Sequence, residues 1–93
     1  MITPTTLGNK AFHLESLSYS GGNTAQLDVL YRDRDNGIVR ETVEYAVPPG
    51  FGEVVKALAG QCPMHMVGFQ EQDGQLYLAD ARTVWGYSCP CNG

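Results

Sequence analysis

The stretch PPGFGEVVKALAGQ, residues 48–61, decides the fold class. Its apolar residues recur at the i, i+3, i+4 and i+7 spacing of one helix face: Phe51, Val54, Val55 and Leu58. Two prolines precede the pattern and Gly60 follows it, as at the start and end of a helix. Because an isolated helix this short is marginal in water, we predict a helix over Phe51–Ala59 packed on a sheet. We expect it to bury Val55 and Leu58 most deeply.

Strand-like segments lie on both sides of this helix. Apolar and polar residues alternate over residues 12–19, 24–32, 39–47, 64–71 and 75–81. The first segment changes parity, which a β-bulge near Glu15 and Ser16 would reconcile. Residues 82–87 would extend the last strand or form another. The predicted fold is α+β, an antiparallel sheet of about five or six strands in two β-hairpins with one short helix on one face.

Turn chemistry predicts the register of the first hairpin. A three-residue loop over residues 35–37, with Gly37 in the left-handed conformation, makes one face continuously apolar. This register sets Val29 opposite Val43 and Arg32 opposite Arg40.

The second hairpin contains an Asp-Gly pair at residues 73–74, which is typical of a two-residue turn. That turn sets Phe69 opposite Leu78. Continued along both strands, the same register sets His65 opposite Arg82.

Size, charge and cysteine content limit the classes of protein to which this chain can belong. The 93 residues suit one small domain, with a flexible lead-in over about residues 1–10 and a flexible tail over about residues 88–93. The net charge is −4 with no basic run, which argues against nucleic acid and anionic membranes as partners. No apolar run approaches the roughly 20 residues of a membrane-spanning helix, and the first ten residues lack the regions of a signal peptide. Three cysteines are too few for a disulfide scaffold, so we expect a cytoplasmic protein with reduced thiols.

Cysteine and histidine residues offer one candidate metal site. Cys62, His65, Cys89 and Cys91 are zinc-type ligands. Their spacing departs from the usual pairs of structural zinc sites, and Pro90 stiffens the short segment between Cys89 and Cys91. The sequence therefore predicts no metal and no cofactor, with a zinc-stabilised domain as an alternative.

Candidate binding residues gather near the second hairpin: His65, Asp80, Arg82, Trp85 and Tyr87. The predicted register places the first three on one face, where they could bind a polar ligand or transfer protons. A solvated ion pair on the sheet surface is the simpler interpretation. Trp85 and Tyr87 offer large contact areas with polar groups, although a lone tryptophan more often closes the core.

No sequence motif indicates catalysis. The chain has no phosphate-binding loop and no nucleophile elbow, so an enzyme is not favoured. The favoured function is a protein-interaction or binding module that presents a sheet face or edge, because one helix cannot cover all the apolar strand surface. A homodimer is the simplest partner, with another protein as the next choice. The rival interpretation is a small-ligand pocket or weak enzyme centred on His65, Asp80 and Arg82.

Overall fold

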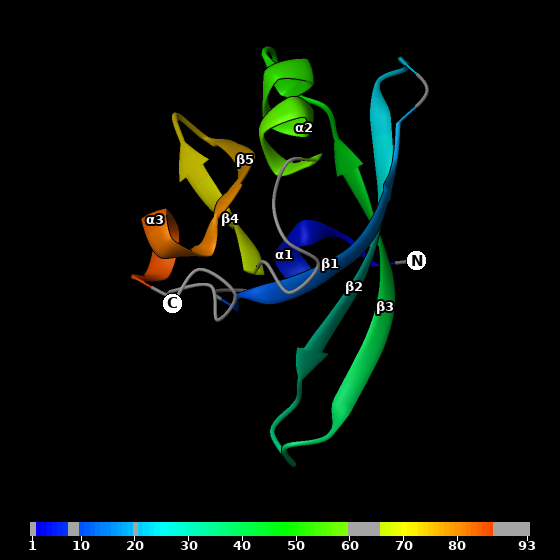
Figure 1. Ribbon diagram of the computed structural model, residues 1–93, viewed down its shortest axis with the longest axis vertical. Coiled ribbons are helices and arrows are strands. Elements are labelled where there is room, and N and C mark those ends of the chain that lie inside the picture. Colours follow the sequence, from blue (N-terminus) through cyan, green and yellow to red (C-terminus); the bar gives the residue numbers. More distant parts are fainter. Residues whose placement is uncertain (1, 8–9, 20, 60–65, 87–93) are drawn as a thin grey trace.

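The described part of the chain forms a five-stranded antiparallel sheet with three short helices (Figure 1). The computed structural model describes residues 2–7, 10–19, 21–59 and 66–86. The strands are β1 (Phe12–Ser18), β2 (Thr24–Arg32), β3 (Ile38–Ala46), β4 (Met66–Gln72) and β5 (Gln75–Asp80). The helices are α1 (Pro4–Leu7), α2 (Phe51–Ala59) and α3 (Ala81–Trp85). The sheet order is β3-β2-β1-β4-β5, and the predicted α+β class is confirmed.

Helix α2 covers the core between the β1–β3 part of the sheet and the β4–β5 hairpin (Figure 1). Its first residue, Phe51, is 2% exposed, and its ring centroid lies 5.5 Å from that of Tyr45 and 5.1 Å from that of Tyr19. The predicted bounds of the helix are confirmed. The predicted depth of Val55 is wrong, since α2 meets the core through its first turn and Val55 is only half-buried. The side chain of Leu58 lies outside the described part.

The core is formed by apolar side chains from every strand and from the N-terminal segment. Tilted rings pack together in its centre, with the Phe69 ring centroid 5.4 Å from that of Phe12 and 5.2 Å from that of Tyr45. The buried members are Leu7, Phe12, Ala25, Leu27, Val29, Val43, Tyr45, Phe51, Val67, Phe69 and Leu78.

Strand β1 joins the two halves of the sheet. It pairs with β2 along most of its length, but with β4 only through Phe12 and His13. Its register against β2 shifts between Leu14 and Ser16, so the predicted bulge is confirmed. A bulge bends and twists a strand, and β1 curves visibly across the molecule (Figure 1).

The predicted register of the β2–β3 hairpin is wrong by two residues. Arg32 lies opposite Ile38, so the loop has five residues, 33–37. The Asp33 carboxylate accepts hydrogen bonds from the main-chain N–H groups of Asp35 and Gly37, at 3.0 and 2.8 Å. This side chain stabilises the longer loop by satisfying main-chain donors that strand pairing would otherwise use. A shift of two leaves the faces unchanged, and the apolar residues still share one face.

The N-terminal segment belongs to the fold. Ile2 pairs in parallel with Val43, donating to the Thr42 carbonyl at 3.0 Å and accepting from the Glu44 N–H at 2.9 Å. Leu7 in α1 is buried in the core. The segment that the sequence indicated as a lead-in thus supplies both a main-chain pair and a core side chain.

The second hairpin has the predicted two-residue turn, and the expected pairing of Phe69 with Leu78 is confirmed. Residues 82–87 were expected to be extended, and this is wrong for residues 82–85, which lie in α3. The Asp80 carboxylate caps the helix by accepting from the Arg82 N–H at 2.7 Å. Gly86 ends it in the left-handed conformation, at φ 73°.

Tyr45 links the two outermost strands of the sheet. Its hydroxyl donates to the Leu76 carbonyl at 2.9 Å and accepts from the Leu78 N–H at 3.0 Å. Both groups lie on the edge of β5 that faces away from β4, because main-chain direction alternates along an antiparallel strand. The sheet therefore curls until its edge strands face each other, and one hydroxyl joins them.

We expect Tyr45→Phe to lower the free energy of unfolding by about 1–3 kcal/mol, the cost of leaving buried polar groups without partners. Urea unfolding measures this change. The matched control is Tyr77→Phe, whose hydroxyl makes a 3.4 Å bond to neighbouring Gln75 at the surface. That control should change stability by less than about 0.5 kcal/mol. Equal effects of the two substitutions would contradict a structural role for the Tyr45 hydroxyl.

Stability should also depend on the ionisation of Tyr45. Burial raises the pKa of Tyr45 from 10.0 to about 12. Between pH 10 and 12 the unfolded chain releases a proton that the folded chain keeps, so the free energy of unfolding falls as pH rises. Tyr45→Phe lacks this contribution. The stability difference between wild type and Tyr45→Phe should therefore shrink across this window, and a constant difference would contradict the assignment.

Candidate functional site

The predicted binding residues are only partly brought together. Asp80 caps α3, while the Arg82 side chain is exposed to solvent. His65 and Tyr87 lie outside the described residues. The four zinc-type ligands, Cys62, His65, Cys89 and Cys91, also lie outside them, and the described residues contain no cluster of three or more metal-binding side chains. Asp80 thus has a local structural role, and the expected three-residue site stays a prediction.

Trp85 packs on the outer face of β4. Gly68 lies under the indole, and a Cβ atom at this glycine would stand 2.5 Å from Nε1 of Trp85. Phe69, the next residue, points into the core, so the indole covers the opposite face. The expectation that Trp85 closes the core is wrong, because α3 folds back over the outside of the hairpin and leaves Trp85 37% exposed.

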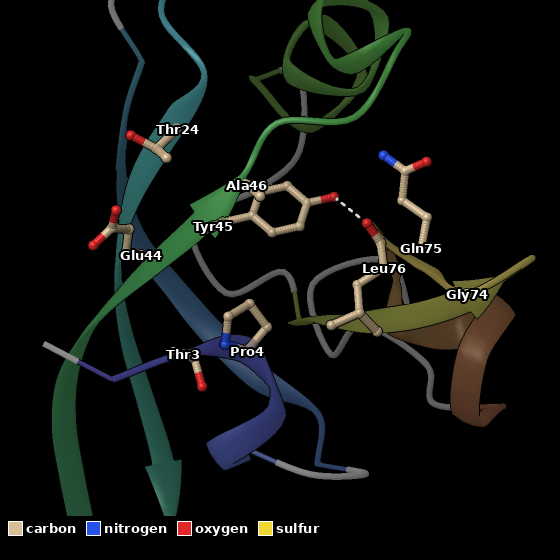
Figure 2. Close-up of a pocket in the computed structure, with 9 residues that line it drawn as sticks. All are labelled: Thr3, Pro4, Thr24, Glu44, Tyr45, Ala46, Gly74, Gln75 and Leu76. Carbon is tan, nitrogen blue, oxygen red and sulfur yellow. Dashed lines mark hydrogen bonds between the residues drawn. The ribbon is translucent and has the colours of Figure 1, made fainter.

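A cavity of about 540 Å³ lies between the two edge strands (Figure 2). It is lined by Thr3, Pro4, Thr24, Glu44, Tyr45, Ala46, Gly74, Gln75 and Leu76. The Tyr45 ring crosses it towards Leu76, whereas the side chains of Thr24 and Glu44 point away from β5 (Figure 2). The cavity is thus lined by main chain, by apolar groups and by the polar residues Thr3 and Gln75, and its volume suits a small neutral molecule or one apolar side chain.

The outer edge of β3 is the second candidate site. Thr42 and Glu44 direct main-chain groups outward to Ile2, whereas Gly37 and Val47 bond towards β2. By this alternation the N–H and C=O groups of Ile38 and Arg40 also point outward. Within the described residues no hydrogen bond pairs them. We call the main-chain groups of Ile38 and Arg40 the open edge.

Two features make the open edge accessible. The loop half of the β2–β3 hairpin projects away from the helices (Figure 1), and the Ile38 side chain is 62% exposed. The Arg40 side chain is 71% exposed and donates from Nε to Oε1 of Glu15 at 2.9 Å. Unpaired edge groups beside an exposed apolar side chain can add another extended chain.

Polar side chains cover the outer face of β1–β3 next to this edge. Ser16 and Thr42 donate hydrogen bonds to the Asp28 carboxylate at 2.6 and 2.8 Å. The hydrogen bond from Ser16, and to a lesser extent that from Thr42, lowers the pKa of Asp28 below its usual value. Hydrogen-bonded polar side chains thus occupy this part of the outer face, and Ile38 is the exposed apolar side chain at the open edge.

The sequence did not indicate where the open edge lies. Strand periodicity assigned residues to faces, but the position of Ile2 on β3 is a contact between distant residues with no local signal.

Comparison with known proteins found no matching family model, no matching curated protein and no matching solved structure. No helix among the described residues is long and apolar enough to cross a membrane.

Gly68 should be essential for the position of Trp85. Gly68→Ala places a methyl group against the indole, so we expect a loss of about 1–3 kcal/mol in unfolding free energy, typical of overpacking. The fluorescence of Trp85, the single tryptophan of the chain, should shift to longer wavelength as the indole leaves the sheet. Gly52→Ala is the control, because a Cβ there meets no atom within 4 Å. If both variants kept the wild-type emission, the packing described for Trp85 would be wrong.

Proposed function

We propose that the chain is a protein-interaction module that binds an extended segment of a partner protein along the open edge of β3. The observation that carries this proposal is the pairing of Ile2, which already adds an extended main chain to the same edge at Thr42 and Glu44. The edge thus accepts strand-type hydrogen bonds, and Ile38 and Arg40 continue it without a partner among the described residues.

Chemistry of the edge supports an extended chain as the ligand. Main-chain groups provide affinity in strand addition, and alternate side chains provide selectivity. Ile38 offers the apolar contact. Charged side chains on an edge disfavour the addition of another strand, but the charge of Arg40 is paired with Glu15 and should disfavour it less than an unpaired guanidinium would. In this proposal the module works in the cytoplasm, where its cysteines stay reduced.

The cavity between β3 and β5 supports a second candidate function, the binding of a small neutral molecule. Its volume of about 540 Å³ falls within the range of ligand pockets. It ranks second because the Tyr45 hydroxyl that crosses it already bonds to β5. This cavity is a separate candidate from the site predicted at His65, Asp80 and Arg82, because neither Asp80 nor Arg82 is among its described lining residues.

A peptide selection tests the proposed function. Random seven-residue peptides are displayed on phage, selected on wild type and counter-selected on Arg40→Pro, which removes one outward N–H from the edge. We expect the enriched peptides to bind wild type and to lose at least about tenfold in affinity, near 1.4 kcal/mol, on Arg40→Pro. Their binding should shift the amide resonances of Ile38 and Arg40.

Arg40→Ala is the matched control, because it removes the side chain and keeps the N–H. Its peptide affinity should stay within about threefold of wild type if main-chain pairing dominates. Peptides that bind Arg40→Pro as tightly as wild type, or that shift residues elsewhere, would refute binding at the open edge.

A further inference from the structure

We infer that the open edge pairs with the open edge of a second copy of the chain, antiparallel, about a two-fold axis beside Val39. The inference rests on the proposed function, because it names the partner of the same edge. Edge pairing of identical strands is a common route to a closed, two-fold dimer, in which one surface patch meets itself.

The free main-chain groups limit the register of such a pair. Thr42 and Glu44 already bond to Ile2, so a register centred on Glu41 would compete with that pairing and set Glu41 opposite itself. A register centred on Arg40 would set two guanidinium-bearing residues opposite each other. The axis beside Val39 avoids both conflicts.

In this register Ile38 of each copy lies opposite Arg40 of the partner subunit. Each of the two pairs exchanges two main-chain hydrogen bonds, because both residues point their N–H and C=O groups outward. The four bonds use the whole open edge and none of the groups that Ile2 holds.

Side chains complement each other in the same register. The exposed Ile38 lies beside the Cβ end of the partner's Arg40, while the rest of that side chain extends towards Glu15 of its own sheet. The guanidinium group is held over its own sheet by Glu15, at 2.9 Å, so the two like charges are directed away from the axis. On the opposite face, half-buried Val39 meets the partner's Val39. Ile38, Val39 and Arg40 thus each gain a compatible neighbour in the pair.

Such a contact is short and should be weak. It buries less surface than the roughly 1,200–2,000 Å² of stable interfaces, so we expect a dissociation constant in the micromolar range or above. Sedimentation equilibrium of wild type from about 10 µM to 1 mM should show a monomer–dimer equilibrium. Arg40→Pro should shift it towards monomer by at least about tenfold, and Arg40→Ala much less.

Disulfide trapping tests the register. In a chain whose Cys62, Cys89 and Cys91 are replaced by serine, Val39→Cys places two thiols across the axis. Residues in such a non-hydrogen-bonded pair have Cα atoms about 4.5 Å apart, within the roughly 4.4–6.8 Å that a disulfide spans. We expect most of this variant to run as a covalent dimer after mild oxidation, while Glu41→Cys in the same background stays monomeric.

The outcomes separate the inference from the proposed function. Cross-linking of Glu41→Cys rather than Val39→Cys, or a dimer that neither variant traps, overturns the register. A monomer at all concentrations overturns the second copy as partner, while peptides that bind at Ile38 and Arg40 would leave the interaction module standing. A monomer for which the peptide selection also fails refutes both.

Discussion

The hydroxyl of Tyr45 holds the two ends of the sheet together. An open five-stranded sheet has two edges, and edge groups that are buried without partners are costly. Here the sheet curls over a ring-filled core until β3 and β5 face each other, and the hydroxyl takes the place of a neighbouring strand for Leu76 and Leu78. The core rings of Phe51 and Phe69 fix the Tyr45 ring in the position that this bond requires. Packing and hydrogen bonding therefore depend on the same side chain.

The other edge is covered in a different way. On β3 the main chain of Ile2 pairs with Thr42 and Glu44, and α1 then inserts Leu7 into the core. The Tyr45 hydroxyl can bond to two main-chain groups of β5 only because β3 and β5 come close together there. A segment that pairs along β3, as Ile2 does, can satisfy more main-chain groups the longer it is. The N-terminal segment turns into α1 after a single pair, so Ile2 covers the edge only at Thr42 and Glu44.

Local signals predicted most of the elements, and long-range contacts were missed. The spacing from Phe51, the turn at Asp73 and the parity change at Glu15 each lie within a few residues, so the sequence shows them directly. The five residues of α3 are too few for a helical period, although Asp80 and Gly86 are good capping residues at its ends. The bond from Tyr45 to Leu76 spans 31 residues, and no local pattern indicates it.

The error in the β2–β3 register explains why the candidate site could not be located from sequence. A register shifted by two keeps every residue on its face, so the apolar pattern fits both registers equally well. The choice between them depends on Asp33, whose carboxylate stabilises the five-residue loop through its bonds to Asp35 and Gly37. That loop sets Leu30, and not Arg32, opposite Arg40. Arg40 can then lie across the apolar Leu30 to reach Glu15, without a like charge in its path. Ile38 is the first residue after the loop in both registers, and in the structure its side chain is exposed and its main chain faces outward. The Asp33 carboxylate thus stabilises the register in which Arg40 lies opposite Leu30 and pairs with Glu15.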